Sequence, residues 1–142
     1  MPLIFDWTTW SEWIPLTELD LGTIPNKPGT YVVATRTPIT RVLGSDPEGF
    51  LDVGESSTLR KRIASFLTCA QNPNAYGHMA GIRFALMRFG ELFPVSTLWI
   101  RYAVLETKEL AYAAEGALLK HYTQEHRELP PLNYKYNWSA HE

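Results

Sequence analysis

The chain has a single cysteine, Cys69, among its 142 residues. One cysteine excludes a disulfide within the chain and a zinc site built from several cysteines. No apolar run is long enough to span a bilayer. The first residues also lack the basic segment followed by an apolar one that marks a signal peptide. Since neither a membrane span nor a signal peptide is evident, we expect a cytoplasmic protein that does not enter the membrane. The chain also shows no internal repeat and no low-complexity segment, as expected of a single domain.

Apolar residues make up 45% of the chain and aromatic residues 13%, which is enough for a packed core. A length of 142 residues is typical of one domain, so we take residues 1–142 as a single unit. Residues 1–24 form a Trp-rich extension in which Trp7, Trp10 and Trp13 recur at spacing three. That spacing indicates a short amphipathic turn or helix that docks its aromatic rings on the core.

Charge is unevenly distributed, although the net charge is only −2. Residues 1–57 carry −5 and residues 102–142 carry −2, whereas residues 58–101 carry +5. A local basic region can attract phosphates even on an acidic protein. A solvated helix face is the alternative explanation, so charge alone leaves a nucleic-acid surface as a hypothesis.

Local patterns predict an α+β fold: a small, mainly antiparallel central sheet flanked by helices. β-branched and apolar runs bounded by turn residues predict strands, and apolar positions three and four residues apart predict helices. Ser56 or Ser57 can cap the first helix. The second helix is expected to bury Met79, Ile82 and Leu86. The predicted strands are 30–36, 39–43, 50–54 and 95–106, with a tight turn at 44–49, and the predicted helices are 58–67, 78–90 and 109–127.

Basic residues open the first predicted helix. Leu59 and Ile63 follow the spacing of one apolar helix face. At about 100° per residue, Arg60 and Arg62 flank the two edges of that face, while Lys61 points to solvent. Helical geometry therefore nominates both arginines as ligands of a phosphate and does not choose between them.

Glu115 is the sharpest anomaly in the sequence. Ala111, Ala114 and Leu118 define the inward stripe of the third predicted helix, and Glu115 falls within that stripe. Carboxylates are almost never buried without a partner. We therefore expect Glu115 to meet a cation, a metal ion or strong hydrogen-bond donors, a structural ion pair with an arginine being the alternative.

The order of these features resembles the GIY-YIG nuclease superfamily over residues 25–135. The family's first motif, Gly-Ile-Tyr on the first strand, is matched by Gly29-Thr30-Tyr31. Its second motif, Tyr-Ile-Gly on a neighbouring strand, is matched by Asp52-Val53-Gly54. The family has an arginine on the helix that follows, and Arg62 stands eight residues after Gly54. The resemblance thus selects Arg62 over Arg60.

Later positions extend the resemblance. The metal-binding glutamate of the family matches Glu115, and an asparagine near the end of its domain, after a proline-containing turn, matches Asn133. A bacterial subgroup with an enlarged first hairpin often carries a His-x-x-Gly-x-Arg-like stretch. Here that stretch is matched by His78, Gly81 and Arg83.

The resemblance implies a metal-dependent endonuclease that hydrolyses phosphodiester bonds, in DNA more than in RNA. Glu115 would hold one Mg²⁺ or Mn²⁺ ion through oxygen. Arg62 would stabilise charge on the phosphate in the transition state, and Tyr31 would orient or deprotonate the attacking water. Asn133 would hold the C-terminal tail against the site. His78 could supply an alternative base, its competing role being that of a helix cap.

Two positions depart from the family pattern. Asp52 replaces the second tyrosine, and Glu55 replaces a frequent lysine. Both changes add negative charge where a phosphate should bind, which weakens anion binding. Asp52 could join Glu115 at the metal ion. In the alternative, the site is catalytically degenerate and the domain is a binding module for nucleic acid or protein; since Tyr31, Arg62 and Glu115 are all present, we favour the active nuclease.

Further contacts to nucleic acid are expected from Arg60, Arg83 and Asn133. No zinc finger or helix-turn-helix spacing appears, so specificity would come from loops such as 70–78, from a homodimer or from a protein partner. The aromatic residues of segment 133–138 could stack on bases. We expect them instead to cover the Trp-rich N-terminal extension.

Overall fold

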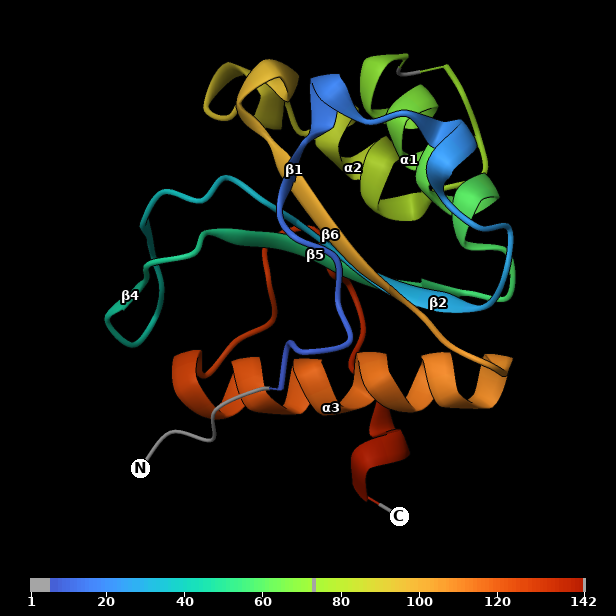
Figure 1. Cartoon of the computed structure of the whole chain (residues 1–142). Helices are drawn as coiled ribbons and strands as arrows, with labels where there is room; N and C mark the ends of the chain where they lie inside the picture. The colour runs from blue at the N-terminus through green and yellow to red at the C-terminus, as the bar shows by residue number, and fades with distance from the viewer. Residues whose placement is uncertain (1–5, 73, 142) are drawn as a thin grey trace.

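The computed structural model describes residues 6–72 and 74–141 and confirms the expected α+β class. Its main sheet has four antiparallel strands in the order β1-β6-β2-β5, and β3 pairs with β4 in a separate hairpin (Figure 1). The strands are β1 Ile14–Pro15, β2 Gly29–Ala34, β3 Ile39–Thr40, β4 Ser45–Asp46, β5 Phe50–Ser56 and β6 Trp99–Val104. The helices are α1 Leu59–Gln71, α2 Met79–Leu86 and α3 Lys108–His126, with short 3₁₀ turns η1 Leu16–Glu18, η2 Leu21–Thr23, η3 Phe89–Glu91, η4 Val95–Thr97 and η5 Trp138–His141.

The sheet lies between two helical layers, with α1 and α2 on one face and α3 on the other (Figure 1). Strand alternation assigns side chains to the two layers. In β2, Tyr31 and Val33 belong to the apolar cluster that includes α1 and α2, whereas Val32 and Ala34 belong to the cluster that includes α3. Both faces of β2 are thus buried, which explains its continuous apolar sequence.

The predicted strand 39–43 and the turn after it are wrong. Only Ile39 and Thr40 form a strand, and they pair with Ser45 and Asp46, inside the predicted turn. This hairpin is not part of the main sheet. The reversal occurs at Gly44, whose φ of +71° favours glycine.

The predicted end of the third strand at Gly54 is also wrong, because β5 continues to Ser56. Gly54 is an ordinary strand residue and faces Tyr31 across the sheet. The N-cap of α1 is Thr58, whose side chain forms no capping hydrogen bond. Ser56 contributes nearby by accepting the backbone N–H of Thr58 at 3.0 Å.

Helix α2 buries a different face from the one expected. Its buried residues are Ala80, Gly81 and Phe84, while Met79 and Leu86 are exposed. The reason is close packing against α1: a methyl group on Gly81 would lie 2.8 Å from the backbone oxygen of Phe66. The contact face of α2 is therefore determined by its small residues, and it differs from the face that the spacing of its large apolar residues predicted.

The N-terminal tryptophans pack on the α3 side of the sheet. Trp7, Trp10 and Trp13 join the cluster of Phe50, and the guanidinium of Arg101 lies 4.2 Å from the ring centre of Trp7. This agrees with the docking role expected for them; residues 1–5 of the extension lie outside the described residues. Across residues 6–72 and 74–141, none of the helices combines the length and apolar character needed to cross a membrane.

Candidate active site

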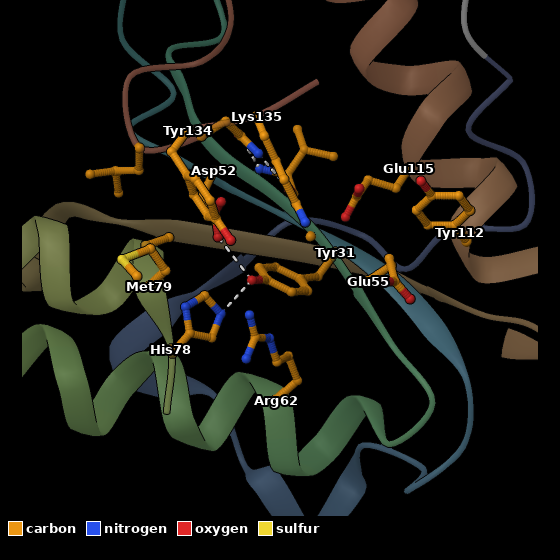
Figure 2. A pocket seen from close by; sticks show the side chains of 15 residues that line it. Tyr31, Asp52, Glu55, Arg62, His78, Met79, Tyr112, Glu115, Tyr134 and Lys135 are labelled. Atoms are coloured by element: carbon orange, nitrogen blue, oxygen red, sulfur yellow. Dashed lines mark hydrogen bonds between the residues drawn. The ribbon is translucent and has the colours of Figure 1, made fainter. Parts of the chain in front are cut away.

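A cavity of about 200 Å³, the Tyr31 pocket, opens where β2, β5, the three helices and the segment after α3 meet (Figure 2). Its lining includes the side chains on which the expected chemistry depends: Tyr31, Asp52, Arg62, His78, Glu115 and Asn133. A phenol, a guanidinium and a carboxylate from distant parts of the chain therefore share one cavity. The residues Arg60 and Arg83 do not line it.

Strand register places Asp52 beside Tyr31. Tyr31 pairs with Gly54 across β2 and β5, so Asp52, two residues along the same face, is its diagonal neighbour. The Tyr31 hydroxyl donates a hydrogen bond of 2.8 Å to Oδ2 of Asp52. The same hydroxyl lies 2.6 Å from Nε2 of His78, at the start of α2 (Figure 2).

Burial controls the ionisation of both Tyr31 and Asp52. Burial, and then the charge of Asp52, raise the pKa of Tyr31 well above its usual value, so the resting side chain is a neutral phenol. Burial likewise raises the pKa of Asp52 to about 6, although the Tyr31 hydrogen bond and the charges of Arg62 and Arg83 oppose the rise. Asp52 is thus a carboxylate at neutral pH that can accept a proton readily.

His78 takes the capping role that the sequence offered and also contacts Tyr31. It is the N-cap of α2, where Nδ1 accepts the backbone N–H of Gly81 at 3.3 Å. Its ring also contacts the Tyr31 hydroxyl. Burial, and then the charge of Arg62, lower the pKa of His78 to about 3, so the ring is neutral. Since Nδ1 accepts, Nε2 carries the proton and donates it to the Tyr31 oxygen.

Arg62 keeps its charge free for a ligand. Its Nη1 donates to the backbone carbonyl of Gly77 at 2.8 Å. Within the part of the chain that the structure describes, no carboxylate lies within ion-pair distance of this guanidinium. A guanidinium that contacts only a carbonyl can still bind a phosphate with its remaining donors.

Glu115 lies across the pocket from Arg62 and does not pair with it (Figure 2). Its Oε1 accepts a hydrogen bond of 3.1 Å from Nδ2 of Asn137. Burial, and then the charges of Glu55 and Asp52, raise the pKa of Glu115 to about 7, while Asn137 and Lys108 act in the opposite direction. A half-buried carboxylate with one hydrogen bond is a strong acceptor for a cation.

The donor set fits one oxygen-liganded metal ion at Glu115. The second oxygen, Oε2, has no hydrogen bond from the described residues, so it is available as a ligand. Among residues 6–72 and 74–141, no group of three or more His, Cys, Asp or Glu side chains is arranged to hold a metal. A Mg²⁺ or Mn²⁺ ion would therefore complete its shell with water and phosphate oxygens, as Mg²⁺ usually does. Oδ1 of Asp52, which lines the same pocket, has no hydrogen bond from the described residues, whereas Oδ2 accepts one from Tyr31.

The negative charge of Glu55 is compensated within the site. Its carboxylate forms an ion pair with Lys108, at the start of α3. The resemblance places a lysine at position 55. Here Glu55 occupies that position and pairs with Lys108 from α3. The added charge at position 55 is local and partly neutralised.

The three further residues expected to contact nucleic acid, Arg60, Arg83 and Asn133, all have hydrogen bonds within the protein. Arg60 donates to the carbonyl of Ile24 at 2.7 Å, and Arg83 donates to the carbonyl of Leu132 at 3.0 Å. The Asn133 amide exchanges two hydrogen bonds of 2.9 Å with the backbone of Val53, as a neighbouring strand would. Asn133 thereby holds the C-terminal segment against the pocket, the role that the resemblance implied.

Sequence reasoning missed several residues of this site. Asn137 and Lys108 gave no signal, because nothing local in the sequence links them to Glu115 or Glu55. Tyr112 could have been found, since it precedes Glu115 by one helical turn. Tyr134 and Lys135 also line the pocket, whereas Tyr136 packs against the same apolar cluster as the N-terminal tryptophans. The aromatic residues of segment 133–138 therefore lie in different environments, Tyr134 at the pocket and Tyr136 at the apolar cluster.

Comparison of the chain with protein-family models, with curated proteins and with solved structures found no match. The assignment of function consequently depends on the chemistry of the Tyr31 pocket.

Proposed function

We propose that this protein is a metal-dependent endonuclease that hydrolyses phosphodiester bonds in nucleic acid, DNA in the first instance. The observation that carries the proposal is the separation of Arg62 and Glu115 in one pocket. Arg62 is a cation and Glu115 is a carboxyl group whose pKa is about 7, and neither has an ionic partner among the described residues. A pocket that keeps a cation and a carboxylate apart suits a ligand pair of opposite signs, such as a phosphate and a metal ion.

Binding and orientation come from Arg62 and Glu115. The guanidinium of Arg62 would hold the non-bridging oxygens of the scissile phosphate and stabilise the charge that develops on them. Glu115 would hold the metal ion, which supplies Lewis-acid polarisation of the phosphate when bound. Tyr31 lines the same pocket as these two side chains, and its hydroxyl points toward Asp52 and His78 (Figure 2).

The hydrogen-bond chain through Tyr31 provides a route for the proton of the attacking water. The Tyr31 hydroxyl points to Oδ2 of Asp52, so Asp52 can take the phenol proton as the phenol oxygen takes one from water. The Nε2–H of His78 would steady the phenol oxygen during this exchange. Water oxygen then bonds to phosphorus, the bond from phosphorus to the leaving oxygen breaks, and that oxygen takes a proton from solvent.

The test is cleavage by the purified chain. Plasmid, single-stranded DNA and RNA are incubated with the protein in Mg²⁺ or Mn²⁺, beside Glu115→Gln and Arg62→Ala variants. Glu109→Gln is the matched control, because Glu109 lies on the same helix, is exposed and does not line the pocket. We expect cleavage by the wild type and the control, none by Glu115→Gln, and a loss of about 100-fold or more in rate for Arg62→Ala.

Absence of cleavage under every condition would contradict the nuclease assignment. Retained binding of oligonucleotides in that case would favour the non-catalytic binding module. Equal cleavage by wild type and Glu115→Gln would assign the activity to a contaminant. Circular dichroism and thermal denaturation of each variant establish that it is folded.

A further inference from the structure

Two exposed tyrosines flank the Tyr31 pocket. Tyr134 is 59% exposed and Tyr112 is 44% exposed, although both line the cavity. Tyr134 lies on the side of Asp52, and Tyr112 lies beside Glu115 (Figure 2). Neither hydroxyl forms a hydrogen bond with the described residues. Large aromatic faces left open on both sides of a polar cavity indicate a ligand with flat apolar surfaces.

The positive charge near the pocket is limited. Arg60 and Arg83 do not line the pocket, and Lys108 is paired with Glu55. Arg62 and Lys135 are the basic residues in the pocket lining, and the Lys135 ammonium lies 5.8 Å from the ring centre of Tyr134. Proteins that bind duplex DNA obtain most of their affinity by neutralising many phosphates. Two basic side chains can bind only one or two phosphates, which is fewer than a duplex-binding protein usually contacts.

We propose, on the basis of the nuclease function above, that the substrate strand has unpaired bases on each side of the scissile phosphate, and that these bases stack on Tyr112 and Tyr134. Arg62 would receive the scissile phosphate, and Lys135 would receive an adjacent one. Stacking is available to every base and is insensitive to sequence, so the pocket would select strand structure in preference to base sequence.

Duplex geometry opposes this arrangement. In a duplex the faces of the bases are covered by their neighbours, so they are not available to a tyrosine ring until the strand is unpaired. The Tyr31 hydroxyl belongs to a side chain that is only 1% exposed. A scissile phosphate must therefore enter the cavity between its walls, which a flexible single strand can do with less distortion than a duplex.

The test is fluorescence anisotropy with a labelled single-stranded DNA 12-mer and with the duplex of the same sequence. All variants carry Glu115→Gln, so that the probe is not cleaved. We expect the single strand to bind at least about tenfold more tightly than the duplex. Tyr112→Ala or Tyr134→Ala should weaken single-strand binding by about fivefold or more, since stacking on one aromatic side chain is worth that much. Phenylalanine keeps the aromatic face, so Tyr112→Phe and Tyr134→Phe should bind the single strand as tightly as the chain that has both tyrosines.

The matched control is Trp138→Ala. Trp138, in η5, is 66% exposed and does not line the Tyr31 pocket; it lines a different hollow with Lys120 of α3 and Arg127, the C-cap of α3. Its removal should leave binding of the single strand unchanged. Equal or tighter binding of the duplex would overturn the proposal, as would unchanged affinity in both Tyr→Ala variants.

Cleavage by the wild-type chain separates this proposal from the nuclease assignment. Cleavage of duplex and single strand at equal rates would overturn the substrate preference and leave the nuclease function standing. Tyrosine-dependent binding of the single strand without any cleavage would support the strand preference and overturn the nuclease function.

Discussion

Gly54 and Tyr31 face each other across β5 and β2, and a methyl group on Gly54 would lie 2.3 Å from the Tyr31 hydroxyl oxygen. The same methyl group would lie 2.4 Å from the ring carbon that bears the hydroxyl. No side chain can occupy this position while the ring stays in place. Glycine is therefore required at position 54 because the Tyr31 ring occupies the space of a side chain. Backbone conformation is not the reason, since the φ of Gly54 is not in the left-handed region.

Gly54→Ala should displace the Tyr31 ring from Asp52 and His78. We expect a destabilisation of about 1–3 kcal/mol, because the displaced hydroxyl leaves buried groups without a partner. Nuclease activity should fall to the level of Tyr31→Phe. Urea denaturation and cleavage assays measure the two effects. Gly44→Ala is a useful comparison, because its added methyl group meets nothing within 4 Å and acts only through a φ of +71°.

Tyr31→Phe should remove the hydrogen bonds to Asp52 and His78 while keeping the ring. We expect a loss of about 1–3 kcal/mol in the free energy of unfolding, because Asp52 is buried and loses its hydrogen-bond donor. The pKa of Asp52 should rise, since the Tyr31 hydrogen bond lowers it. A double-mutant cycle with Asp52→Asn measures the coupling; additive effects of the two changes would contradict a direct interaction.

His78→Asn and His78→Ala should separate the capping role from the catalytic role. Asparagine is a good N-cap and can still accept the backbone N–H of Gly81, but it does not reach Tyr31 as the imidazole does. We expect both variants to lose activity, and His78→Ala to be less stable than His78→Asn by about 1 kcal/mol. Full activity of His78→Asn would limit His78 to a structural role.

Stability should decrease as the pH rises from about 4 to about 8. The pKa of Glu115 is raised to about 7 and that of Asp52 to about 6 in the folded chain. As the pH rises, the unfolded chain therefore loses these two protons at a lower pH than the folded chain does. The stability that the protonated carboxyl groups contribute is complete at low pH, and it is lost as the pH rises through their pKa values in the folded chain. We expect a decrease of about 3 kcal/mol from Glu115, whose pKa rises from 4.5 to about 7, measured by urea denaturation. Glu115→Gln should reduce the slope.

Mg²⁺ should counteract this loss. A cation at Glu115 competes with the proton, so it binds more tightly at pH 8 than at pH 5.5 and stabilises the folded chain by mass action. We expect the midpoint of thermal unfolding to rise with Mg²⁺ at pH 8 and to change little at pH 5.5. The Glu115→Gln variant should show no Mg²⁺-dependent rise at either pH. A rise of equal size in wild type and variant would place the ion elsewhere.

Local patterns in the sequence predicted several features that the structure has. The predicted strands 30–36 and 50–54 correspond to the paired strands β2 and β5, although their ends differ by up to two residues. The helical spacing around Glu115 placed a carboxylate on the inner side of α3, and it lines the pocket. These predictions depend on periodicity within one element, which local sequence determines.

Other features depend on how the elements pack. The face of α2 was mispredicted because Gly81 approaches α1 closely, a contact that hydrophobic spacing does not reveal. The two hydrogen bonds of the Tyr31 hydroxyl join residues 21 and 47 positions apart in the sequence. The sequence alone thus determined the residue types and the faces of the strands. Only the tertiary structure decided which side chains meet, because strand register and helix approach set those distances.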